Sequence, residues 1–422
     1  MFGTRNPEVL VVGAGPVGLF AALRLASHGV RVGIVDREWR PGAHSYALAL
    51  HASSVTILEE LGLRDRLLQA AYPVRTAGLY DAAGGRRAEI RLPGGEGAAY
   101  VTVMRQDALE RLLERALKRA GVKVAWNHEV VRLVPEHGRV GATINELVKD
   151  TGGYAVAHSE WVVARSSDVN VPWVVGADGH RSLVRRLLGI DFAEAGPAQH
   201  FAVFEFKTTA ELGDEMRLIL GEQTADVLWP LPEGYCRFSF ELPGFAGSQA
   251  ARTKSRVPVE IGTAKYPVLS EESLRALLDE RAPWFEGEIG EIRWRIVVRF
   301  ERRLATSFGR ARMWLAGDAA HITGPAGMQS MNVGLREADE LAGTLAAVIR
   351  GEAPAAKLDE YGRERLDEWR FLLGIEGGLA PGEGTDPWVA RNGARLLPCI
   401  PASGAELTAL AGQIGLKPRQ PT

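Results

Sequence analysis

Residues 9–36 read VLVVGAGPVGLFAALRLASHGVRVGIVD: a short apolar run, a turn with three glycines, a longer apolar run at helical spacing, and a third run that ends on an acid. The first and last runs are short and β-branched, which is typical of buried strands. The middle run begins at Pro16 and stops at Gly29, as helices often do. The stretch therefore predicts a strand–helix–strand unit around a GxGxxG turn.

Each glycine of this turn has a physical role in nucleotide binding. Gly13 allows the tight turn, Gly15 lets a pyrophosphate approach the backbone, and Gly18 lets the helix pack on the strand. The helix N-terminus offers N–H groups and a partial positive charge to phosphates, and Asp36 is placed to accept hydrogen bonds from a ribose. The motif fits NAD and FAD equally, and a glycine turn used for packing alone is the alternative. The predicted contacts are Gly13, Gly15, Pro16, Gly18, Asp36 and Arg37.

A second turn of this kind occurs three hundred residues later, in LAGDAAHITGPAGMQSMN at residues 315–332. A strand runs into Asp318, and a long helix follows that ends near Gly351. FAD must be held at two distant places, whereas NAD needs only the first turn. Asp318 suits the ribityl chain, and the helix N-terminus suits the anionic reduced flavin, with a dipole contribution of about 0.3–2 kcal/mol. The alternative is a capped helix with Asp318 as a turn acid and His321 as a core histidine.

A third feature lies between these two turns. Residues 172–190, PWVVGADGHRSLVRRLLGI, predict a strand, then Asp178 and Gly179, then a short helix with Ser182 near its start. An ordinary connection between a helix and a strand is the alternative for this segment taken alone.

In this order, the three features resemble the group A flavin monooxygenases, the para-hydroxybenzoate hydroxylase-like family. The resemblance implies that Asp178 and Gly179 lie by the pyrophosphate and the NAD(P)H route, and that Gly317 and Asp318 contact the ribityl chain. In VMRQDALERLLERAL, Arg105 matches a position that reaches the FAD. The further contacts that the resemblance implies at the start of the late helix are Pro325, which also forms the flavin-side wall of the pocket, Gly327, Met328, Met331 and Asn332.

The chain departs from the family pattern at several positions. Ser330 stands where the family usually has a second glycine, which is expected to tilt the flavin ring or narrow its slot. Asp36 is one methylene shorter than the usual Glu, and Tyr46 occupies a place where an arginine often lies close to the flavin.

The resemblance implies an α/β fold with a Rossmann-like, GR2-type FAD-binding domain and a β-sheet substrate domain. We expect the FAD-binding domain to be discontinuous, over residues 1–75, 101–190 and 300–374. Residues 76–100 and 191–299 then form the β-rich substrate domain, and residues 375–422 an extended and helical tail with a short helix in GAELTALAGQIG. Residues 244–268 are polar and unpatterned, which favours a surface loop over a lid on the substrate.

The resemblance also implies an activity. NAD(P)H reduces FAD, O2 forms a flavin C4a-hydroperoxide, and its distal oxygen hydroxylates an aromatic or polyketide-like small molecule. Such a site needs a dry, mostly apolar pocket. We expect the inward positions of the β-rich domain to line it, although most of these residues suit plain sheet core equally well. The candidates are Phe204, Phe206, Leu228, Trp229, Phe238 and Phe240.

Composition narrows the alternatives. Among 422 residues, 46% are hydrophobic and 24% are charged, with a net charge of −2, which argues against a nucleic-acid or membrane-surface partner. Cys236 and Cys399 match no metal spacing, no metal site is expected, and a reducing cytoplasm is favoured over a disulfide framework. No acid–base residue stands out. A secretory segment at residues 9–23 is disfavoured because it leaves the three glycines unexplained.

Three other functions stay open at this stage. The same fold serves as a flavin reductase or dehydrogenase that does not use O2 productively, and as a Baeyer–Villiger-type oxygenase. A non-catalytic flavoprotein that keeps FAD for stability is the third, and Ser330 is the feature that favours it.

Overall fold

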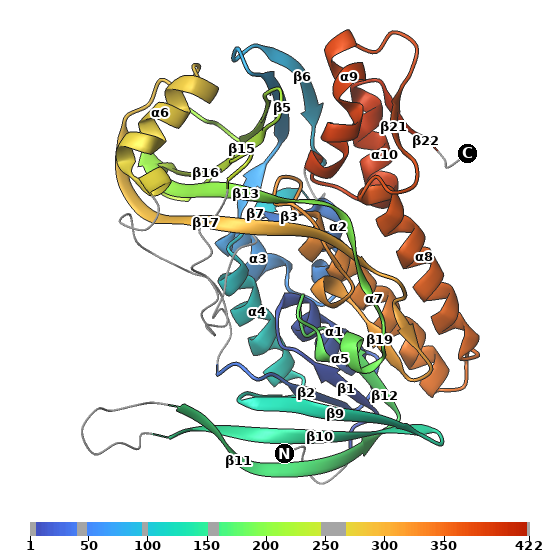
Figure 1. The fold of residues 1–422 in the computed structure, drawn as a ribbon. Helices are drawn as coiled ribbons and strands as arrows, with labels where there is room; N and C mark the ends of the chain where they lie inside the picture. The colour runs from blue at the N-terminus through green and yellow to red at the C-terminus, as the bar shows by residue number, and fades with distance from the viewer. Residues whose placement is uncertain (1–5, 40–48, 95–99, 151–159, 246–266, 420–422) are drawn as a thin grey trace.

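A computed structural model of the chain describes residues 6–39, 49–94, 100–150, 160–245 and 267–419. Two β-layers with surrounding helices make up the fold (Figure 1). The parallel sheet and its helices lie in the lower part of that view, and a larger, mainly antiparallel sheet lies above them. The α/β fold class predicted from the sequence is confirmed.

The first layer is a six-stranded sheet in which β1 lies between β12 and β2. All residues of β1 and β12 are buried, which explains their unbroken apolar runs, because a strand covered on both faces has no polar side. All neighbours pair in parallel except β18 and β19. In sheet order the strands are β18 (Gly309–Arg310), β19 (Met313–Leu315), β12 (Trp173–Gly176), β1 (Val9–Val12), β2 (Val32–Val35) and β8 (Val124–Ala125).

Helices pack beside this sheet, with α1 in contact with both α4 and α7 and with α8 against α7 (Figure 1). The buried side chains of α1 join the same core as those of β1. The helix bounds are α1 (Pro16–Ser27), α2 (Ala52–Glu59), α3 (Arg64–Ala70), α4 (Gln106–Arg119), α5 (Leu183–Leu187), α7 (Gln329–Ile349) and α8 (Ala356–Leu372).

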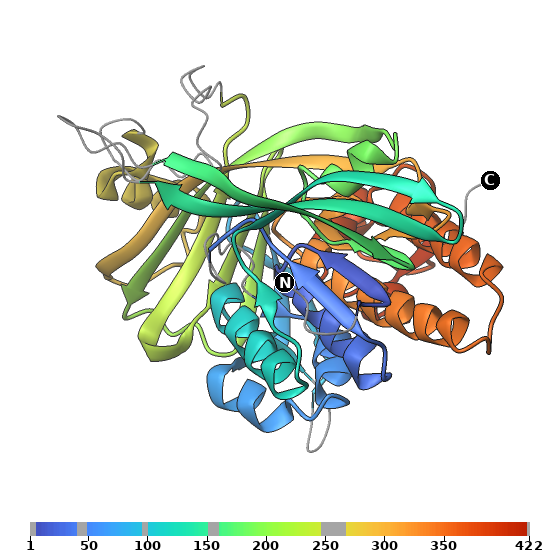
Figure 2. The same ribbon diagram turned by 90° about the horizontal axis from the view of Figure 1, so that it is seen from below.

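A three-stranded antiparallel sheet, in the order β11–β10–β9, crosses the other side of the parallel sheet (Figure 2). Val140, Ala142 and Ile144 of β10 alternate along the strand and are buried in the main core, so one face of this sheet covers the parallel one. Its strands are β9 (His128–Glu136), β10 (Arg139–Asp150) and β11 (Glu160–Val171).

The second layer is an eight-stranded sheet with two long central strands, β13 and β17. The predicted β-rich segments supply β5, β6 and β13–β16, and the predicted boundary at residue 300 falls inside β17. The division into domains stays a prediction. In sheet order the strands are β20 (His321–Ile322), β17 (Ile289–Ala305), β13 (Phe192–Thr208), β16 (Tyr235–Glu241), β15 (Ala225–Pro230), β14 (Glu215–Leu220), β5 (Thr76–Asp81) and β6 (Arg86–Arg91).

Helix α6 (Glu271–Arg281) lies on the face of this sheet that points away from the parallel sheet (Figure 1). Leu274 and Leu278 of the helix pack into an aromatic cluster on that face. The long strand β17 reaches the first layer at its other end, where Leu304 pairs with His321 of β20, just after the second glycine turn.

The remaining described elements connect these layers. Strand β7 (Val101–Val103) lies between β3 (Ala49–Leu50) and β4 (Tyr72–Val74) in a small antiparallel sheet. Short 3-10 turns occur at Pro232–Gly234, Pro267–Leu269, Gly317–Ala319 and Leu397–Cys399.

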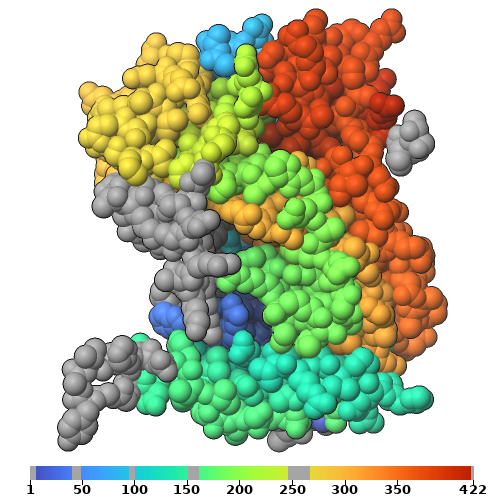
Figure 3. All heavy atoms as spheres, in the orientation of Figure 1, coloured from blue at the N-terminus to red at the C-terminus, as the bar shows by residue number. Residues whose placement is uncertain are grey.

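The C-terminal segment is a compact unit and not an extended tail. It contains β21 (Gly378–Pro381), α9 (Pro387–Leu396), α10 (Gly404–Gln413) and β22 (Leu416–Arg419), of which α10 falls in the stretch expected to be helical. Arg395 donates to the carbonyl oxygens of Gly221 (2.8 Å) and Thr224 (2.6 Å), so the unit is bonded to the eight-stranded sheet. Figure 3 shows its surface, in red, against the yellow-green surface of that sheet.

Among the helices that the structure describes, none combines the length and the apolar character that crossing a membrane requires.

Candidate functional site

The first glycine turn is closed by contacts that leave no room for side chains at two positions. Gly13 has φ +101°, and a Cβ there would overlap the carbonyl oxygen of Ala177 and lie 2.8 Å from Cα of Asp178. A Cβ on Gly18 would overlap the carbonyl oxygen of Gly13. At Gly15, by contrast, an added Cβ meets nothing within 4 Å. Two glycines therefore serve packing, and the third faces open space where a ligand can approach.

Helix α1 begins at that open space. The N-cap residue is Gly15, so no side chain caps the helix. Pro16 occupies the first helical position, and the first turn contains no acidic residue. The first turn of any helix leaves backbone N–H groups without partners inside the helix. With no side chain serving these donors, the end of α1 fits a phosphate group.

Asp36 fastens this turn to the end of β2. Its Oδ2 accepts the backbone N–H of Ala14 (2.6 Å), and its Oδ1 accepts that of Glu38 (2.7 Å). Burial raises the pKa of this carboxyl, and the two backbone bonds oppose the rise. A carboxylate oxygen accepts more than one hydrogen bond, so the predicted ribose contact is compatible with this role. Nε of Arg37 lies 3.7 Å from Oε1 of Glu38, and its contact with the cofactor stays a prediction.

In the mid-chain DG motif, Asp178 accepts hydrogen bonds from the start of helix α5, whose N-cap is Ser182. It accepts the hydroxyl of Ser182 (2.5 Å) and the backbone N–H of Leu183 (2.6 Å). Burial raises the pKa of Asp178, against the effect of these bonds. Gly179 has φ +75° and open space at its Cβ position. Within this motif, the hydrogen bonds of Asp178 hold the turn together, and Gly179 leaves space beside the backbone that a ligand can enter.

The late GD turn lies directly against the first turn. Gly317 has φ +65°, and a Cβ there would lie 2.9 Å from Cγ2 of Val17 in α1. The mid-chain motif joins them, because Arg185 donates to the carbonyl oxygen of Ala319 over 2.7 Å. Three segments far apart in the sequence therefore meet in one place. Asp318 is exposed, although the strand before it and its neighbours on both sides are buried.

A buried carboxylate holds the GD turn in place. Glu337 of α7 accepts the backbone N–H of Gly317 (2.8 Å), the Nε2–H of His321 (2.9 Å) and the indole N–H of Trp369 (2.7 Å). Burial favours a high pKa for Glu337, but His321 and these bonds outweigh it and hold the pKa below its usual value. His321 also stacks on Trp369, with ring centroids 3.7 Å apart. His321 is therefore a positioning residue, as its alternative interpretation from the sequence suggested.

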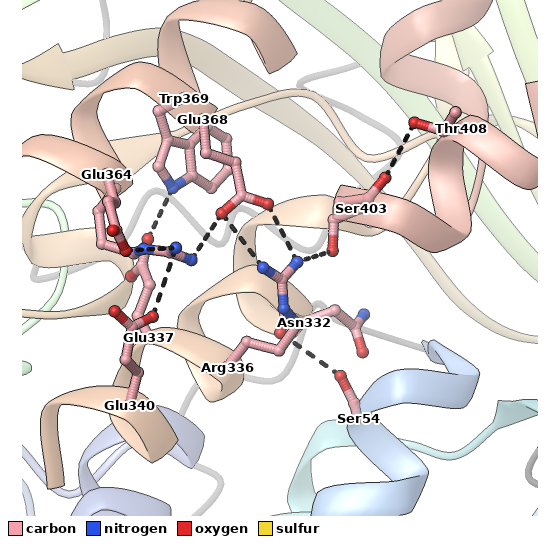
Figure 4. Close-up of polar contacts among 12 residues, drawn as sticks. Ser54, Asn332, Arg336, Glu337, Glu340, Glu364, Glu368, Trp369, Ser403 and Thr408 are labelled. Atoms are coloured by element: carbon pink, nitrogen blue, oxygen red, sulfur yellow. Dashed lines mark hydrogen bonds and ion pairs between the residues drawn. The ribbon is translucent and has the colours of Figure 1, made fainter. Parts of the chain in front are cut away.

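Figure 4 shows this carboxylate beside a second polar network. Arg336 of α7 bonds Glu368 of α8 at 3.0 Å and also the hydroxyl of Ser403, at the start of α10. The C-terminal unit is thus tied to the same helix that follows the GD turn.

The start of α7 is closely packed. A Cβ on Gly327 would lie 2.6 Å from the carbonyl oxygen of Pro398. Met328 adopts φ +51° as the N-cap of the helix, without a side-chain cap. Asn332 donates to the carbonyl oxygens of Ala49 (3.0 Å) and Met328 (2.7 Å). These predicted cofactor contacts thus have structural bonds of their own, and their binding to FAD stays a prediction, as it does for Pro325 and Met331.

His51 completes this packing. Its backbone N–H donates to Oδ1 of Asn332 (2.8 Å), and its Nε2–H donates to the carbonyl oxygen of Gly327 (2.8 Å). Burial lowers the pKa of His51 to about 4, so the ring is neutral near pH 7. Sequence reasoning missed His51 because its partners are 276 and 281 residues away.

The six predicted pocket residues divide between the two faces of the eight-stranded sheet. Five of them pack with α6 into one core, on the face away from the parallel sheet. The prediction that they point inward is therefore corrected. Strand alternation places residues on two faces, but the sequence does not show which face a distant helix covers. The five are Phe204, Phe206, Leu228, Phe238 and Phe240.

The inward face carries a different set. Trp229, the sixth predicted residue, is buried in the main core that includes β1 and α1. It lies opposite Arg237, Arg237 lies opposite Glu205, and Glu205 lies opposite Trp294, so the four form one row across four strands. Phe201, Val203 and Ile296 form an apolar cluster on the same face. The sequence contains a signal for this row, because charged or polar residues alternate with phenylalanine in FEFK and CRFSF. Such alternation predicts that the two kinds of residue lie on opposite faces of a strand.

Glu205 is the centre of this row. It is 1% exposed, and its Oε2 accepts Nε (3.0 Å) and Nη2 (2.7 Å) of Arg237. Its Oε1 accepts Nε of Arg293 at 2.5 Å, and Nη1 of Arg105 lies 3.9 Å away. Burial acts to raise the pKa of Glu205, but the arginines outweigh it and hold the pKa below its usual value. Arg105 therefore reaches from the first layer to the second.

In the part of the chain that the structure describes, no group of three or more His, Cys, Asp or Glu side chains is placed to hold a metal ion. Tyr46 and most of the 244–268 segment lie outside the described residues.

Comparison with known proteins gives the context for this geometry. Residues 6–371 match the family model described as FAD binding domain. The chain is 32% identical over 382 residues to 6-methylpretetramide 4-monooxygenase of Streptomyces rimosus, covering 87% of this chain and 60% of that protein. It is 30% identical over 363 residues to rifampicin monooxygenase of Streptomyces venezuelae, covering 85% and 68%. The chain thus spans about two thirds of the length of these relatives.

Solved structures share the fold. The crystal structure of p-nitrophenol 4-monooxygenase from Pseudomonas putida has a TM-score of 0.67 at 21% identity and covers 97% of this chain and 94% of its own. The anhydrotetracycline hydroxylase from Streptomyces rimosus has a TM-score of 0.64 at 26% identity, covering 93% and 69%. With the three converging glycine turns, these matches show that the chain belongs to the FAD-binding family of group A flavin-dependent monooxygenases.

Proposed function

We propose that this protein is an FAD-dependent monooxygenase that uses NAD(P)H and O2 to hydroxylate an aromatic or polyketide-like small molecule. One observation carries the proposal: Gly317 of the second turn packs on Val17 just after the first turn. Gly334, in the second turn of α7, lies against both Gly317 and Val17, so the first part of α7 is beside the start of α1, and neither helix has a side-chain cap. A single elongated cofactor can use both.

The residues present fit FAD. The open Cβ positions at Gly15 and Gly179 leave room for a pyrophosphate, and the end of α1 supplies donors to it. Exposed Asp318 is the residue we assign to the ribityl hydroxyls. When bound, FAD supplies the electron transfer and O2 chemistry that no side chain provides. The protein contributes position, charge and the exclusion of water.

The names of the relatives support the choice of substrate class. They include monooxygenases of 6-methylpretetramide, rifampicin and pentachlorophenol. In this chain, Phe201, Val203 and Ile296 form a buried apolar cluster on the inward face of the sheet, and the partly buried Trp294, Val298 and Phe300 pack against it. Apolar side chains of this kind suit the lining of a pocket for a planar ring. We assign the aromatic substrate to that face, replacing the phenylalanines chosen from the sequence.

The proposal is tested with the purified protein. We expect it to be yellow, to release FAD on heating, and to couple NAD(P)H oxidation to O2 uptake that rises with an accepted phenol. The product should be heavier by one oxygen atom, and 18O2 should label it. A colourless protein that takes up no FAD contradicts the proposal, and so does full turnover without O2.

Asp318→Ala tests the cofactor assignment. We expect FAD retention to fall at least tenfold, because Asp318 is the only acid that we assign to the ribityl hydroxyls. Asp367→Ala is the matched control, because its side chain is 71% exposed on α8. Equal FAD loading in the two variants argues against the assignment of Asp318.

We also propose a cytoplasmic location. Cys236 and Cys399 are both free and buried, which is compatible with a reducing compartment. Cell fractionation followed by detection of the protein tests this, and recovery in a secreted fraction contradicts it.

A further inference from the structure

We propose that the C-terminal unit fixes the loop before α7, residues 323–328, at a set distance from the eight-stranded sheet, and that Arg395 is the positioning residue of this link. The proposed function places FAD at the starts of α1 and α7 and the substrate on the inward face of the sheet. The link would therefore set the spacing between cofactor and substrate. That consequence rests on the proposed function, whereas the link itself rests on contacts within the chain.

The C-terminal unit holds the end of this loop. The backbone N–H of Gly327 donates to the carbonyl oxygen of Pro398 over 3.0 Å. Gln329, in the first turn of α7, donates from Nε2 to the carbonyl oxygen of Leu397 over 3.1 Å. Gln329, Leu397 and Cys399 are all buried. Hydrogen bonds in a dry interior are costly to break, so the turn Leu397–Cys399 fixes the end of the loop.

The same unit holds the sheet, through the last turn of α9. Arg395 donates from Nη1 to the carbonyl oxygen of Gly221 (2.8 Å) and from Nη2 to that of Thr224 (2.6 Å). Both carbonyls belong to the turn between β14 and β15, residues 221–224. Because the guanidinium group is planar and rigid, two bonds from it fix direction as well as distance. Arg395 thus joins the β14–β15 turn to the segment that holds the loop.

The sheet in turn reaches the start of the loop. Glu241 of β16 accepts the backbone N–H of Ala225 with Oε2 (2.7 Å) and the amide Nε2 of Gln199 with Oε1 (2.7 Å). Ala225 follows the β14–β15 turn directly. A Cβ on Gly324 would lie 2.9 Å from Oε1 of Gln199, so the amide of Gln199 lies against the loop.

These contacts form a closed ring. The loop is bonded to the C-terminal unit, the unit to the β14–β15 turn, and the turn to Glu241. Gln199 returns the ring to the loop. Each member of such a ring is held from two sides, so loosening one link allows the others to shift. Arg395 is therefore expected to act on the loop although it does not touch it.

Other anchors should keep the unit docked when Arg395 is changed. The side-chain amide of Gln413 bonds the backbone N–H and the carbonyl oxygen of Arg91, at the edge strand β6, over 2.8 and 2.9 Å. Arg336 of α7 bonds the hydroxyl of Ser403. Loss of the Arg395 bonds therefore releases the β14–β15 turn without detaching the unit.

The spacing matters to the reaction because oxygen transfer requires the ring at a fixed place. A displacement of about 1 Å lowers the rate of such a step by up to about 100-fold. When transfer fails, NAD(P)H, a proton and O2 give NAD(P)+ and hydrogen peroxide, and the substrate is recovered unchanged. The fraction of NAD(P)H that yields peroxide therefore measures the loss of positioning.

The link is tested first without cofactor, by amide hydrogen exchange of the FAD-free protein. In Arg395→Gln we expect exchange to rise at least about fivefold in peptides covering residues 221–226 and also in those covering 323–330. Arg391→Gln, an exposed arginine of the same helix, should exchange like the wild type. A rise confined to residues 221–226 shows that Arg395 holds only its own turn, and it overturns the proposal.

The consequence is tested with the FAD-loaded protein and an accepted phenol. In Arg395→Gln we expect product per NAD(P)H to fall at least about threefold and peroxide to rise to match. The KM for the phenol and the dissociation constant of FAD should stay within about twofold. Arg391→Gln should keep the wild-type ratio. Unchanged product per NAD(P)H in Arg395→Gln contradicts the proposal.

A second variant opens the ring at the other end. Gln329→Met removes the bond to Leu397 and should lower product per NAD(P)H in the same way. The double variant should be no worse than the more affected single variant, because both changes open one ring. Independent, multiplying effects contradict the ring. Thermal unfolding shows that each variant is folded, and Arg395→Lys, which can bond one carbonyl at a time, serves if Arg395→Gln does not fold.

Failure of the proposed function is recognised separately, because hydrogen exchange needs neither FAD nor turnover. A protein in which exchange of the two segments rises together, but which retains no FAD, contradicts the proposed function and keeps the link. A protein that hydroxylates phenols with the same product per NAD(P)H in all variants does the opposite.

Discussion

The hydroxyl of Ser330 donates a hydrogen bond to Oδ1 of Asp318 over 2.7 Å. Ser330 lies in the first turn of α7, and Asp318 is the acid of the GD turn. The resemblance implies a glycine at position 330 and predicts that a serine there tilts the flavin or narrows its slot. The bond indicates another role, because it fixes one oxygen of Asp318 and leaves the other for the ribityl chain.

Removing this hydroxyl should weaken FAD binding. A hydrogen bond to a charged group contributes about 1.5–3 kcal/mol when buried, and less at an exposed acid. We therefore expect Ser330→Gly and Ser330→Ala to raise the dissociation constant of FAD three- to tenfold, measured by flavin fluorescence, with Ser330→Thr near the wild-type value. Tighter binding in Ser330→Gly shows that the serine obstructs the cofactor instead.

Glu337→Gln should destabilise the GD turn strongly. The carboxylate of Glu337 accepts hydrogen bonds from three donors, which belong to Gly317, His321 and Trp369. The amide of glutamine would place an N–H group, itself a donor, against one of them. Leaving buried groups unpaired costs about 3 kcal/mol or more. Urea unfolding measures the loss, and FAD retention should fall with it. Trp369→Phe, which removes one donor, should lose less, and Glu360→Gln on the surface of α8 almost nothing. Wild-type stability in Glu337→Gln contradicts the role given to Glu337.

Two glycines of the first turn should respond differently to alanine. Gly13→Ala meets the carbonyl of Ala177 at φ +101°, so the protein should unfold at lower temperature or not fold. Gly15→Ala meets nothing within 4 Å, so the unfolding midpoint should stay near wild type while FAD affinity falls at least tenfold. Gly343→Ala in α7, also unobstructed, is the control that should keep FAD. Full FAD binding by Gly15→Ala would contradict the assignment of a phosphate-binding position to Gly15.

Acid should destabilise the protein through His51. Its pKa is about 4 in the fold and near 6.5 when unfolded. The neutral ring therefore contributes stability that is fully present above pH 6.5 and is lost as the pH falls through 4. Between pH 7.5 and 4.5 this amounts to about 2–3 kcal/mol. Urea unfolding of His51→Gln should lack this part of the pH dependence, whereas exposed His137→Gln should retain it. If the free energy of unfolding depends on pH identically in the wild type and in His51→Gln, His51 does not contribute to the loss of stability in acid.

Neighbouring residues on β16 should separate stability from substrate binding. Phe238 is fully buried and stacks on Phe240 at 4.0 Å, so Phe238→Ala should lower the free energy of unfolding by about 3–5 kcal/mol. Ser239 lies opposite Val203 on the inward face and is buried, so Ser239→Ala, which adds no volume, should change the affinity for an accepted phenol with a much smaller effect on stability. If the variant at position 238 changed only the substrate affinity and the variant at position 239 changed only the stability, the two faces of the eight-stranded sheet would be assigned wrongly.

The sequence was sufficient for the parts of the fold that depend on short-range pattern. The unit from β1 to β2 is visible because its glycines, its apolar runs and Asp36 lie within 28 residues, and the same holds for the strand and helix around Asp318. The sequence also predicted that the two turns converge, because one long cofactor such as FAD must be held at two distant places.

Long-range packing could not be predicted in the same way. Phe204 and Glu205 are neighbours in the chain, and their faces are decided by α6, more than sixty residues away. His51 and Glu337 are single polar residues in ordinary surroundings, and only the folded chain shows that each closes a turn beside the predicted cofactor site. The C-terminal unit was underestimated because its glycines and prolines hide α9.

Strand β17 carries Trp294 opposite Glu205 and, ten residues on, Leu304 opposite His321. Ten residues of extended chain span about 33 Å. One paired strand thus spans the distance between the face assigned to the substrate and the histidine beside the GD turn. A substrate bound on the inward face and the GD turn would therefore both lie against one continuous strand.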